Sequence, residues 1–197
     1  MNLPIDLQNT TLFTERLILR PWTWDDLDDL YAYASVDGVG QPAGWMPHRS
    51  REESREILAK FLSDGSIFAI ERAADRRVIG SLGIHSTPWE KLPPEENPYP
   101  HLRTCEIGYV LAKPYWGQGL MPEAVRRVQA YLFCDCAADL VFVSHYDFNT
   151  QSRRVIEKCG FVHVGVEQHY ARQIGQTYRC LRYALDRKTY LQNTTEP

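Results

Sequence analysis

One segment of the sequence, residues 106–124, runs from a strand-like stretch through a glycine loop into a helix. The loop holds Gly117 and Gly119, and the first helical turn holds Pro122 and Glu123, which both favour a helix start. Such a loop turns several backbone N–H groups inward, beside the unsatisfied donors of the helix start. Together these groups form an anion site without any Lys or Arg. The segment therefore predicts a pyrophosphate site, with a simple tight turn as the alternative.

Two other phosphate-binding motifs do not fit these residues. The Walker A loop requires G-x-x-x-x-G-K-S/T, and the dinucleotide fingerprint requires G-x-G-x-x-G with an acidic residue about 20 positions later. Here Gly117-Gln-Gly119 is followed by Leu-Met-Pro. A nucleotide-binding module is therefore disfavoured, because the Walker lysine is missing.

The remaining sequence predicts one α+β domain with a mixed sheet. Apolar residues at every second position indicate strands, and apolar residues three and four apart indicate helices. The expected order is a strand at 16–20, helices after Thr23 and after Ser50, strands at 66–71, 78–85 and 105–111, a helix at 120–133, a strand at 140–144, a helix at 149–160, and strands at 161–167 and 178–185. This β-α-α-β-β-β-α-β-α-β-β order contains no repeat or linker. One domain over residues 1–197 is expected, with a core at about 14–185 and flexible termini.

The helix boundaries carry recognisable signals. Thr23 and Asp26 form a capping box, and Ser50 opens the second helix, which ends near Gly65. Asn149 is expected to be the N-cap of the helix at 149–160. The buried stripe of the first helix is expected to hold Leu27, Leu30, Tyr31 and Ala34.

Residues 88–101 contain five prolines. Proline removes a backbone donor and fixes φ, so regular structure is excluded from this segment. A passive surface loop is expected, with a lid or an interface as the alternatives.

The composition excludes several classes of protein. The chain has 22 Lys and Arg against 25 Asp and Glu, a net charge of −3, and lacks the basic stripe that nucleic-acid binding needs. It shows no basic flank followed by an apolar run, and no apolar stretch near the ~20 residues of a membrane span. The five cysteines are irregularly spaced, which predicts free thiols and no zinc site. We therefore expect a soluble, cytoplasmic protein with no metal, nucleic-acid or membrane partner.

Residues 116–121, Trp-Gly-Gln-Gly-Leu-Met, resemble the acetyl-CoA-binding loop of the GNAT superfamily of N-acetyltransferases. Gly119 matches the glycine that the family pattern requires, whereas Trp116 and Met121 depart from the pattern. Its RimJ/RimL-like branch, which acetylates protein N-termini, commonly has such a Trp-Gly-x-Gly loop. A second signature, from Asn149 to Phe161, resembles that branch's N-x-x-S…K-x-G-F motif. The resemblance covers about residues 14–185 and implies a GNAT fold, with a mixed, mostly antiparallel central sheet flanked by helices.

The resemblance implies acetyl-CoA as the co-substrate and no metal. The pyrophosphate is expected on the backbone amides of the loop, and the pantetheine arm along the strand near Val110, paired with backbone as an added strand would be. Asn149 is expected to contact acetyl-CoA or a bound water. The cofactor-binding residues predicted in this way are Val110, Leu111, Gly117, Gln118, Gly119, Leu120, Met121 and Asn149.

Two catalytic groups are also implied by the resemblance. Glu106 matches the position of the general base in GNAT histone acetyltransferases and is expected to accept the proton of the acceptor amine, directly or through water. Ser152 matches the serine of N-x-x-S and is expected to protonate the departing CoA thiolate. The simpler alternatives are a strand carboxylate facing solvent or Arg103, and an ordinary first-turn serine.

The expected reaction is acetyl transfer to a primary amine by direct attack on the thioester. A protein or peptide N-terminus is the acceptor that the resemblance implies first, and a polyamine, an amino acid or an antibiotic stays open. A CoA-binding sensor without turnover is the alternative, and association into a homodimer is left open. Four further candidates for the cleft wall are His85, His145, Tyr146 and Asp147, without the nucleophile that a hydrolase triad needs.

Overall fold

An eight-stranded sheet forms the centre of the computed structural model, which describes residues 3, 5–93 and 95–195. The strands lie in the order β1-β2-β3-β4-β5-β6-β8-β7. Every neighbouring pair is antiparallel except β5 and β6, which are parallel. The strands are β1 (Leu12–Phe13), β2 (Leu17–Arg20), β3 (Ile67–Arg72), β4 (Val78–His85), β5 (Thr104–Leu111), β6 (Leu140–Tyr146), β7 (Val162–Ala171) and β8 (Gln176–Asp186).

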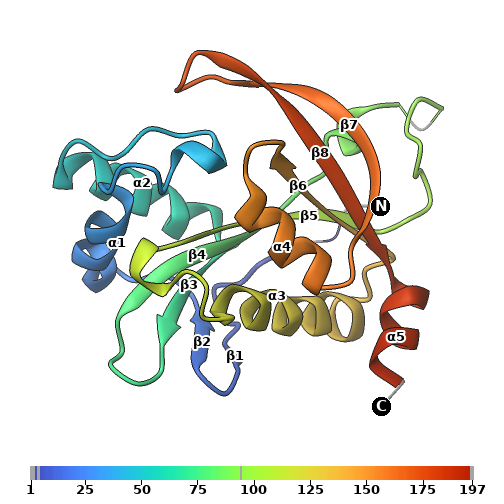
Figure 1. Cartoon of the computed structure of the whole chain (residues 1–197). Helices are drawn as coiled ribbons and strands as arrows, with labels where there is room; N and C mark the ends of the chain where they lie inside the picture. The colour runs from blue at the N-terminus through green and yellow to red at the C-terminus, as the bar shows by residue number, and fades with distance from the viewer. Residues whose placement is uncertain (1–2, 4, 94, 196–197) are drawn as a thin grey trace.

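Helices cover both faces of this sheet (Figure 1). They are α1 (Leu27–Ala34), α2 (Arg51–Asp64), α3 (Leu120–Ala130), α4 (Thr150–Lys158) and α5 (Arg187–Thr195). Ala69 of β3 packs with residues of α1 and α2, whereas its neighbours Phe68 and Ile70 pack with residues of α3. Successive strand residues face opposite sides, so α1 and α2 lie on one face and α3 on the other. The α+β class and the predicted order of elements are confirmed, with β1 and α5 added at the two ends.

The local signals place most boundaries correctly. The Ser50 hydroxyl accepts the amide N–H of Glu53 at 3.2 Å, and Gly65 ends α2 with φ +58°. The Asn149 side chain accepts the amide N–H of Ser152 at 3.0 Å. The expectation that residues 88–101 hold no regular structure is corrected at one place, where Pro88–Lys91 form a 3₁₀ helix that begins at the proline. The other described residues of the segment are irregular, and Pro94 lies outside the described part.

The buried stripe of α1 differs from the prediction at one position. Leu27, Leu30 and Ala34 are buried as expected, but Tyr33 is buried and Tyr31 is only half-buried. The Tyr33 hydroxyl bonds to Ser81 of β4, so the helix is rotated toward this contact. Apolar spacing alone contained no information about it.

The packed structure extends past the predicted core of residues 14–185. Leu7 and Leu12 are buried in the main cluster, and the Leu7 amide donates to the Gly65 carbonyl at 2.7 Å. At the other end, Tyr190 of α5 stacks on Phe133 with ring centroids 4.7 Å apart. These residues pack against the rest of the domain, and the flexibility of the termini stays a prediction. The isolated leucines of the leader show no periodicity, which explains why the sequence pattern misses them.

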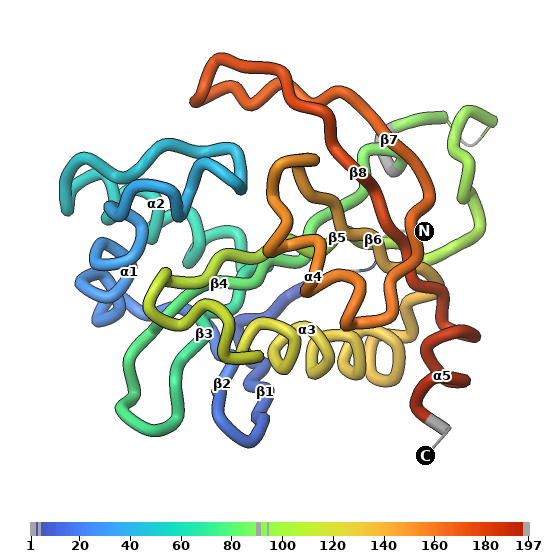
Figure 2. Tube along the Cα trace, in the orientation of Figure 1, coloured from blue at the N-terminus to red at the C-terminus, as the bar shows by residue number. Residues whose placement is uncertain are grey.

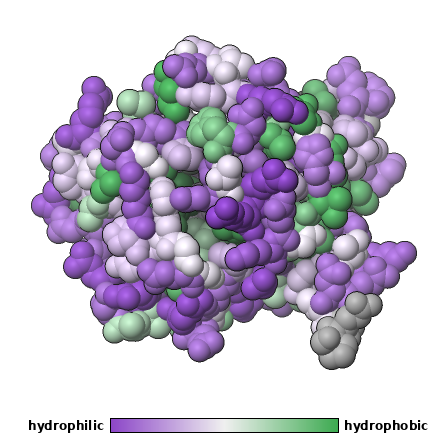
Figure 3. Space-filling view, in the orientation of Figure 1, coloured by the Kyte–Doolittle hydropathy of each residue, from purple (hydrophilic) through white to green (hydrophobic). Residues whose placement is uncertain are grey.

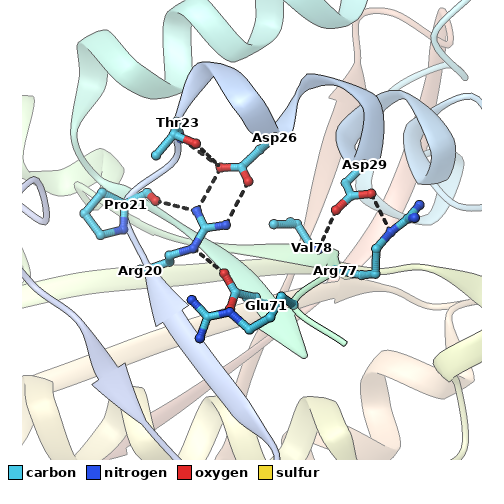
Figure 4. Close-up of polar contacts among 9 residues, drawn as sticks. Arg20, Pro21, Thr23, Asp26, Asp29, Glu71, Arg77 and Val78 are labelled. Atoms are coloured by element: carbon cyan, nitrogen blue, oxygen red, sulfur yellow. Dashed lines mark hydrogen bonds and ion pairs between the residues drawn. The ribbon is translucent and has the colours of Figure 1, made fainter. Parts of the chain in front are cut away.

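An ionic network around the buried carboxylates of Asp26 and Glu71 joins β2, β3 and the start of α1 (Figure 4). Arg20 forms two hydrogen bonds of 2.8 Å with the carboxylate of Asp26. Its Nε donates to Glu71, whose side chain is 2 % exposed. The other Glu71 oxygen lies 2.6 Å from Nε of Arg76. The network therefore connects the start of α1 to strands β2 and β3.

We expect Glu71→Gln to lower the free energy of unfolding by about 2 kcal/mol. The change removes the charge that two guanidinium groups share in a buried position, and a hydrogen bond to a charged group contributes about 1.5–3 kcal/mol. Urea unfolding followed by circular dichroism measures the loss. Asp75→Asn, which breaks an exposed ion pair with Arg72 in the same hairpin, is the control and should leave the midpoint unchanged. Equal midpoints for both variants would contradict a stabilising role for Glu71.

Candidate active site

Strands β5 and β6 pair over only part of their length. Their register runs from Thr104 opposite Leu140 to Ile107 opposite Val143, although both strands continue. The Ala112 amide donates to Ile79 of β4 at 2.8 Å. By the alternation of an antiparallel ladder, Tyr109 and Leu111 turn their backbone groups away from β4, toward the gap. The gap therefore leaves strand backbone open inside the sheet, where an extended ligand can pair with it.

A cleft of about 990 Å³ includes this gap. Its walls come from β5, the start of α3, α4, β6 and the β7–β8 hairpin, which reaches beyond the rest of the sheet (Figure 2). Figure 3 shows a recess with apolar residues at its floor near the centre of one face. The cleft lets one ligand contact groups on both faces of the sheet.

The glycine loop forms one end of the cleft. Gly117 and Gly119 have φ of +75° and +77°, the left-handed region that favours glycine. Gly119 directly precedes α3, whose first N–H groups have no partner within the helix. Both glycines line the cleft together with Leu120 and Met121. The strand, loop and helix predicted from the sequence are confirmed, and the helix start faces the cavity.

Arg16 supports this loop from outside the cleft. Its Nη1 donates to the Gln118 carbonyl at 3.0 Å, and its Nε donates to the Glu123 carboxylate at 2.7 Å. The Thr14 hydroxyl also donates to Glu123, at 2.6 Å. Burial works against ionisation of Glu123, but these bonds outweigh it and lower the pKa of its carboxyl. The sequence prediction did not include Arg16, which is 107 positions away from Glu123.

The predicted cofactor residues separate into two groups. Those that line the cleft are Val110, Leu111, Gly117, Gly119, Leu120, Met121 and Asn149. Gln118 does not line it, because its side chain is exposed and donates to the Pro114 carbonyl at 2.8 Å. Arg154 and Lys158 of α4 add positive charge to the lining. The prediction did not include these two basic residues, although both lie in the helix expected at 149–160.

Glu106 lies in the same cleft, on β5. The Ser144 hydroxyl donates to its Oε1 at 2.7 Å. Arg103, one alternative partner, instead forms an ion pair with Asp139. His85 stands opposite Glu106 in the β4–β5 register. Desolvation by the surrounding protein lowers the pKa of the His85 imidazole, and the charge of Glu106 raises this pKa to a smaller extent. Glu106 therefore has one oxygen bound to a hydroxyl, and it forms no ion pair with a Lys or Arg side chain among the residues that the structure describes.

Ser152 forms a hydroxyl pair with Tyr109 on the other side of the gap. The two hydroxyl oxygens are 3.0 Å apart, and burial raises the pKa of Tyr109. Tyr109 lines the cleft between the predicted residues of β5, but sequence reasoning did not select it. Asn149 uses its side chain to cap α4 and to donate to the Pro42 carbonyl at 3.3 Å. Its helix-capping role is thus confirmed, whereas contact with acetyl-CoA stays a prediction.

The remaining candidates do not form a second catalytic group. His85, His145 and Tyr146 line the cleft, whereas Asp147 does not. Both ring nitrogens of His145 lie near oxygens, the Tyr146 carbonyl at 2.7 Å and the Tyr183 hydroxyl at 3.4 Å. Among the described residues, no group of three or more His, Cys, Asp or Glu is placed to hold a metal ion. Within the same residues no helix is long and apolar enough to cross a membrane.

Comparisons with known proteins agree with this geometry. A family model described as an acetyltransferase (GNAT) domain matches residues 16–162, more than half of the chain. An uncharacterized N-acetyltransferase of Bacillus subtilis, YoaA, is 27% identical over 179 residues, covering 88% of this chain and 95% of that protein.

Solved structures show the same fold. The spermidine N-acetyltransferase of Vibrio cholerae, in complex with CoA and spermine, has a TM-score of 0.71 at 19% identity and covers 90% of this chain and 99% of its own. The ribosomal-protein-S5-alanine acetyltransferase of Vibrio fischeri has a TM-score of 0.68 at 17% identity, with coverage of 92% and 99%. At these identities the likeness concerns the fold.

Proposed function

This chain belongs to the acetyltransferase (GNAT) family and is an N-acetyltransferase, and from this premise we propose that it acetylates the free α-amine of a protein or peptide N-terminus, as in the RimJ/RimL-like branch. The observation that carries the proposal is the gap between β5 and β6. Through this gap one cleft connects the glycine loop and the start of α3 with the carboxylate of Glu106. The helix start suits the pyrophosphate of acetyl-CoA, the co-substrate of the family. The carboxylate suits an acceptor amine that must lose a proton.

The loop and β5 fit acetyl-CoA. The backbone amides at Gly119 to Met121 are proposed to bind the pyrophosphate, with Arg154 and Lys158 adding opposite charge. Tyr109 and Leu111 offer backbone groups to the amides of the pantetheine arm. The Leu111 carbonyl already accepts the Trp116 indole at 2.7 Å, which leaves its amide N–H for the ligand.

Glu106 is proposed to act as the general base. An α-amine has a pKa of about 7.7–8.0 and is partly protonated at neutral pH, so it must lose a proton before it attacks the thioester carbonyl. Ser144 holds one oxygen of Glu106, and the other is available to accept the proton directly or through water. Ser152, paired with Tyr109, is proposed to donate a proton to the CoA sulfur as the tetrahedral intermediate collapses.

The fold neighbours do not choose between acceptors, because they include enzymes named for spermidine and for a ribosomal protein. Thiol release from acetyl-CoA, measured against N-terminal peptides, amino acids, polyamines and aminoglycosides, tests the proposal. Release that depends on peptides with a free N-terminus supports it. Release only with a small amine would support the second acceptor class, and acetyl-CoA binding without acceptor-dependent release would identify a sensor. Mass spectrometry of products in a lysate then identifies the acceptor.

Ser152→Ala is expected to lower kcat about 10-fold and to leave the KM for acetyl-CoA within about 2-fold. General-acid help is expected to fall below the usual contribution of roughly 10²- to 10⁴-fold here, since a thiolate is a good leaving group. Tyr109→Phe is expected to show a smaller loss, because the serine hydroxyl remains. The control is Thr150→Ala, which removes an exposed hydroxyl from the same helical turn. Unchanged kcat in Ser152→Ala would exclude the acid role.

A further inference from the structure

A row of polar side chains crosses the sheet next to the proposed base. Arg182 of β8 stands directly opposite Ser144 of β6, and the Ser144 hydroxyl donates to Glu106 of β5. Paired strands are about 4.8 Å apart, and directly opposite residues project from the same face of a sheet. Arg182 lies in the wall of the same cleft. A guanidinium is therefore placed two strands away from the group that is proposed to accept the amine proton.

The surroundings of Arg182 fix its guanidinium but use few of its donors. Its side chain is 13% exposed, and Nη2 donates to Glu167 at 2.6 Å. Its guanidinium carbon lies 4.7 Å from the ring centroid of Trp89, a distance typical of a cation–π contact. Buried Nε has no hydrogen-bond partner among the described residues. A guanidinium carries five N–H donors, and the described residues accept from only one of its nitrogens.

We propose that Arg182 binds an oxygen of the acceptor that is adjacent to its reactive amine. The oxygen is the carbonyl of the first residue in a peptide, or the carboxylate of a free amino acid. This inference rests on the proposed function and deepens it by assigning a specificity residue. A planar guanidinium suits a carbonyl or carboxylate because its N–H groups form a rigid fork. The acceptor would then be held at two points, with its amine at Glu106 and its oxygen at Arg182.

The charges of the cleft disfavour a polyamine at this position. Apart from histidines, the acidic and basic side chains in the described lining are two carboxylates, Glu106 and Glu167, and three basic groups, Arg154, Lys158 and Arg182. Glu167 is already paired with Arg182, which leaves Glu106 as the carboxylate for an ammonium. A second ammonium near the first would meet the positive charge of Arg182. An amine with a neighbouring oxygen avoids this repulsion.

Arg182→Gln and Arg182→Lys test the assignment. Three acceptors are compared: a hexapeptide with a free N-terminus, the free amino acid that begins it, and spermidine. We expect Arg182→Gln to lower kcat/KM for the acceptor that wild type uses, peptide or amino acid, by roughly 10- to 100-fold, the effect of losing a charged hydrogen bond. The loss should appear in the KM of the acceptor, and spermidine should gain or stay equal. Arg182→Lys should recover part of the loss, and the acceptor with the larger loss identifies the source of the oxygen.

Arg179→Gln is the matched control. Arg179 lies on the same strand, is exposed and does not line the cleft, so its loss should leave all three acceptors unchanged. An equal loss for every acceptor, or a higher KM for acetyl-CoA, would show a structural role and overturn the assignment. Circular dichroism and thermal unfolding check that each variant is folded.

Acceptor binding to the CoA-loaded protein, measured by calorimetry, gives a second readout that needs no turnover. If wild type binds the peptide or the amino acid and Arg182→Gln binds it equally well, the assignment is wrong even when the enzyme acetylates it. If wild type binds the acceptor through Arg182 but releases no thiol, the proposed function fails and the binding site stands. Preference of wild type for spermidine over both oxygen-bearing acceptors would overturn the assignment.

Discussion

Gly119→Leu is expected to weaken CoA binding by at least about 100-fold while the protein stays folded. Gly119 has φ +77° immediately before α3, and a residue with a side chain is strained there by roughly 1–2 kcal/mol. The nearest atom to an added Cβ is Nη2 of Arg16, at 3.6 Å, so the loop has room for a methyl group. A larger side chain at the helix start must displace the loop or enter the cleft. Losing two or three amide hydrogen bonds to a charged pyrophosphate accounts for the expected change.

A matched control separates backbone strain from ligand binding. Gly175, in the turn between β7 and β8, has φ +74° and no atom within 4 Å of an added Cβ. Gly175→Leu therefore introduces a similar backbone cost far from the glycine loop. Calorimetry with CoA should show the loss only for Gly119→Leu, and Gly119→Ala should fall between that variant and wild type. Wild-type affinity in Gly119→Leu would place the pyrophosphate elsewhere.

The sequence predicts those parts of the fold that depend on local contacts. The hydroxyl of Ser50, the left-handed Gly65 and the amide of Asn149 act within three residues or at a single φ angle. These signals work because a helix end must satisfy its free backbone groups within one turn. The same reason makes the loop before α3 recognisable.

Local sequence patterns do not predict contacts between segments that are distant in the sequence. Arg16 reaches the loop from more than 100 positions away. Tyr33 is buried in place of Tyr31, and its hydroxyl bonds to Ser81 of β4, on the sheet face that α1 covers. Arg182 approaches Glu106 only through the pairing of β8 with β6. Each depends on sheet order, which a single sequence specifies through many weak preferences. The family resemblance selects Glu106 and Ser152, whereas only the structure shows that Tyr109 is the partner of Ser152.

Glu106→Gln is expected to lower kcat by about 10²- to 10⁴-fold at pH 7, the usual contribution of a general base. Glutamine has the same shape and still accepts the Ser144 hydroxyl bond, so the KM for acetyl-CoA should change little. Ser144→Ala, which removes only that bond, should lower kcat a few-fold.

The pH profile of Glu106→Gln gives an independent test. Without a base the variant depends on acceptor molecules that have already lost their proton, so its rate should rise with pH until the α-amine is neutral, above about pH 8. Raising the pH therefore reduces the difference in kcat between Glu106→Gln and wild type. A variant with wild-type kcat at pH 7 would instead identify Glu106 as a strand carboxylate whose function is to bind Ser144.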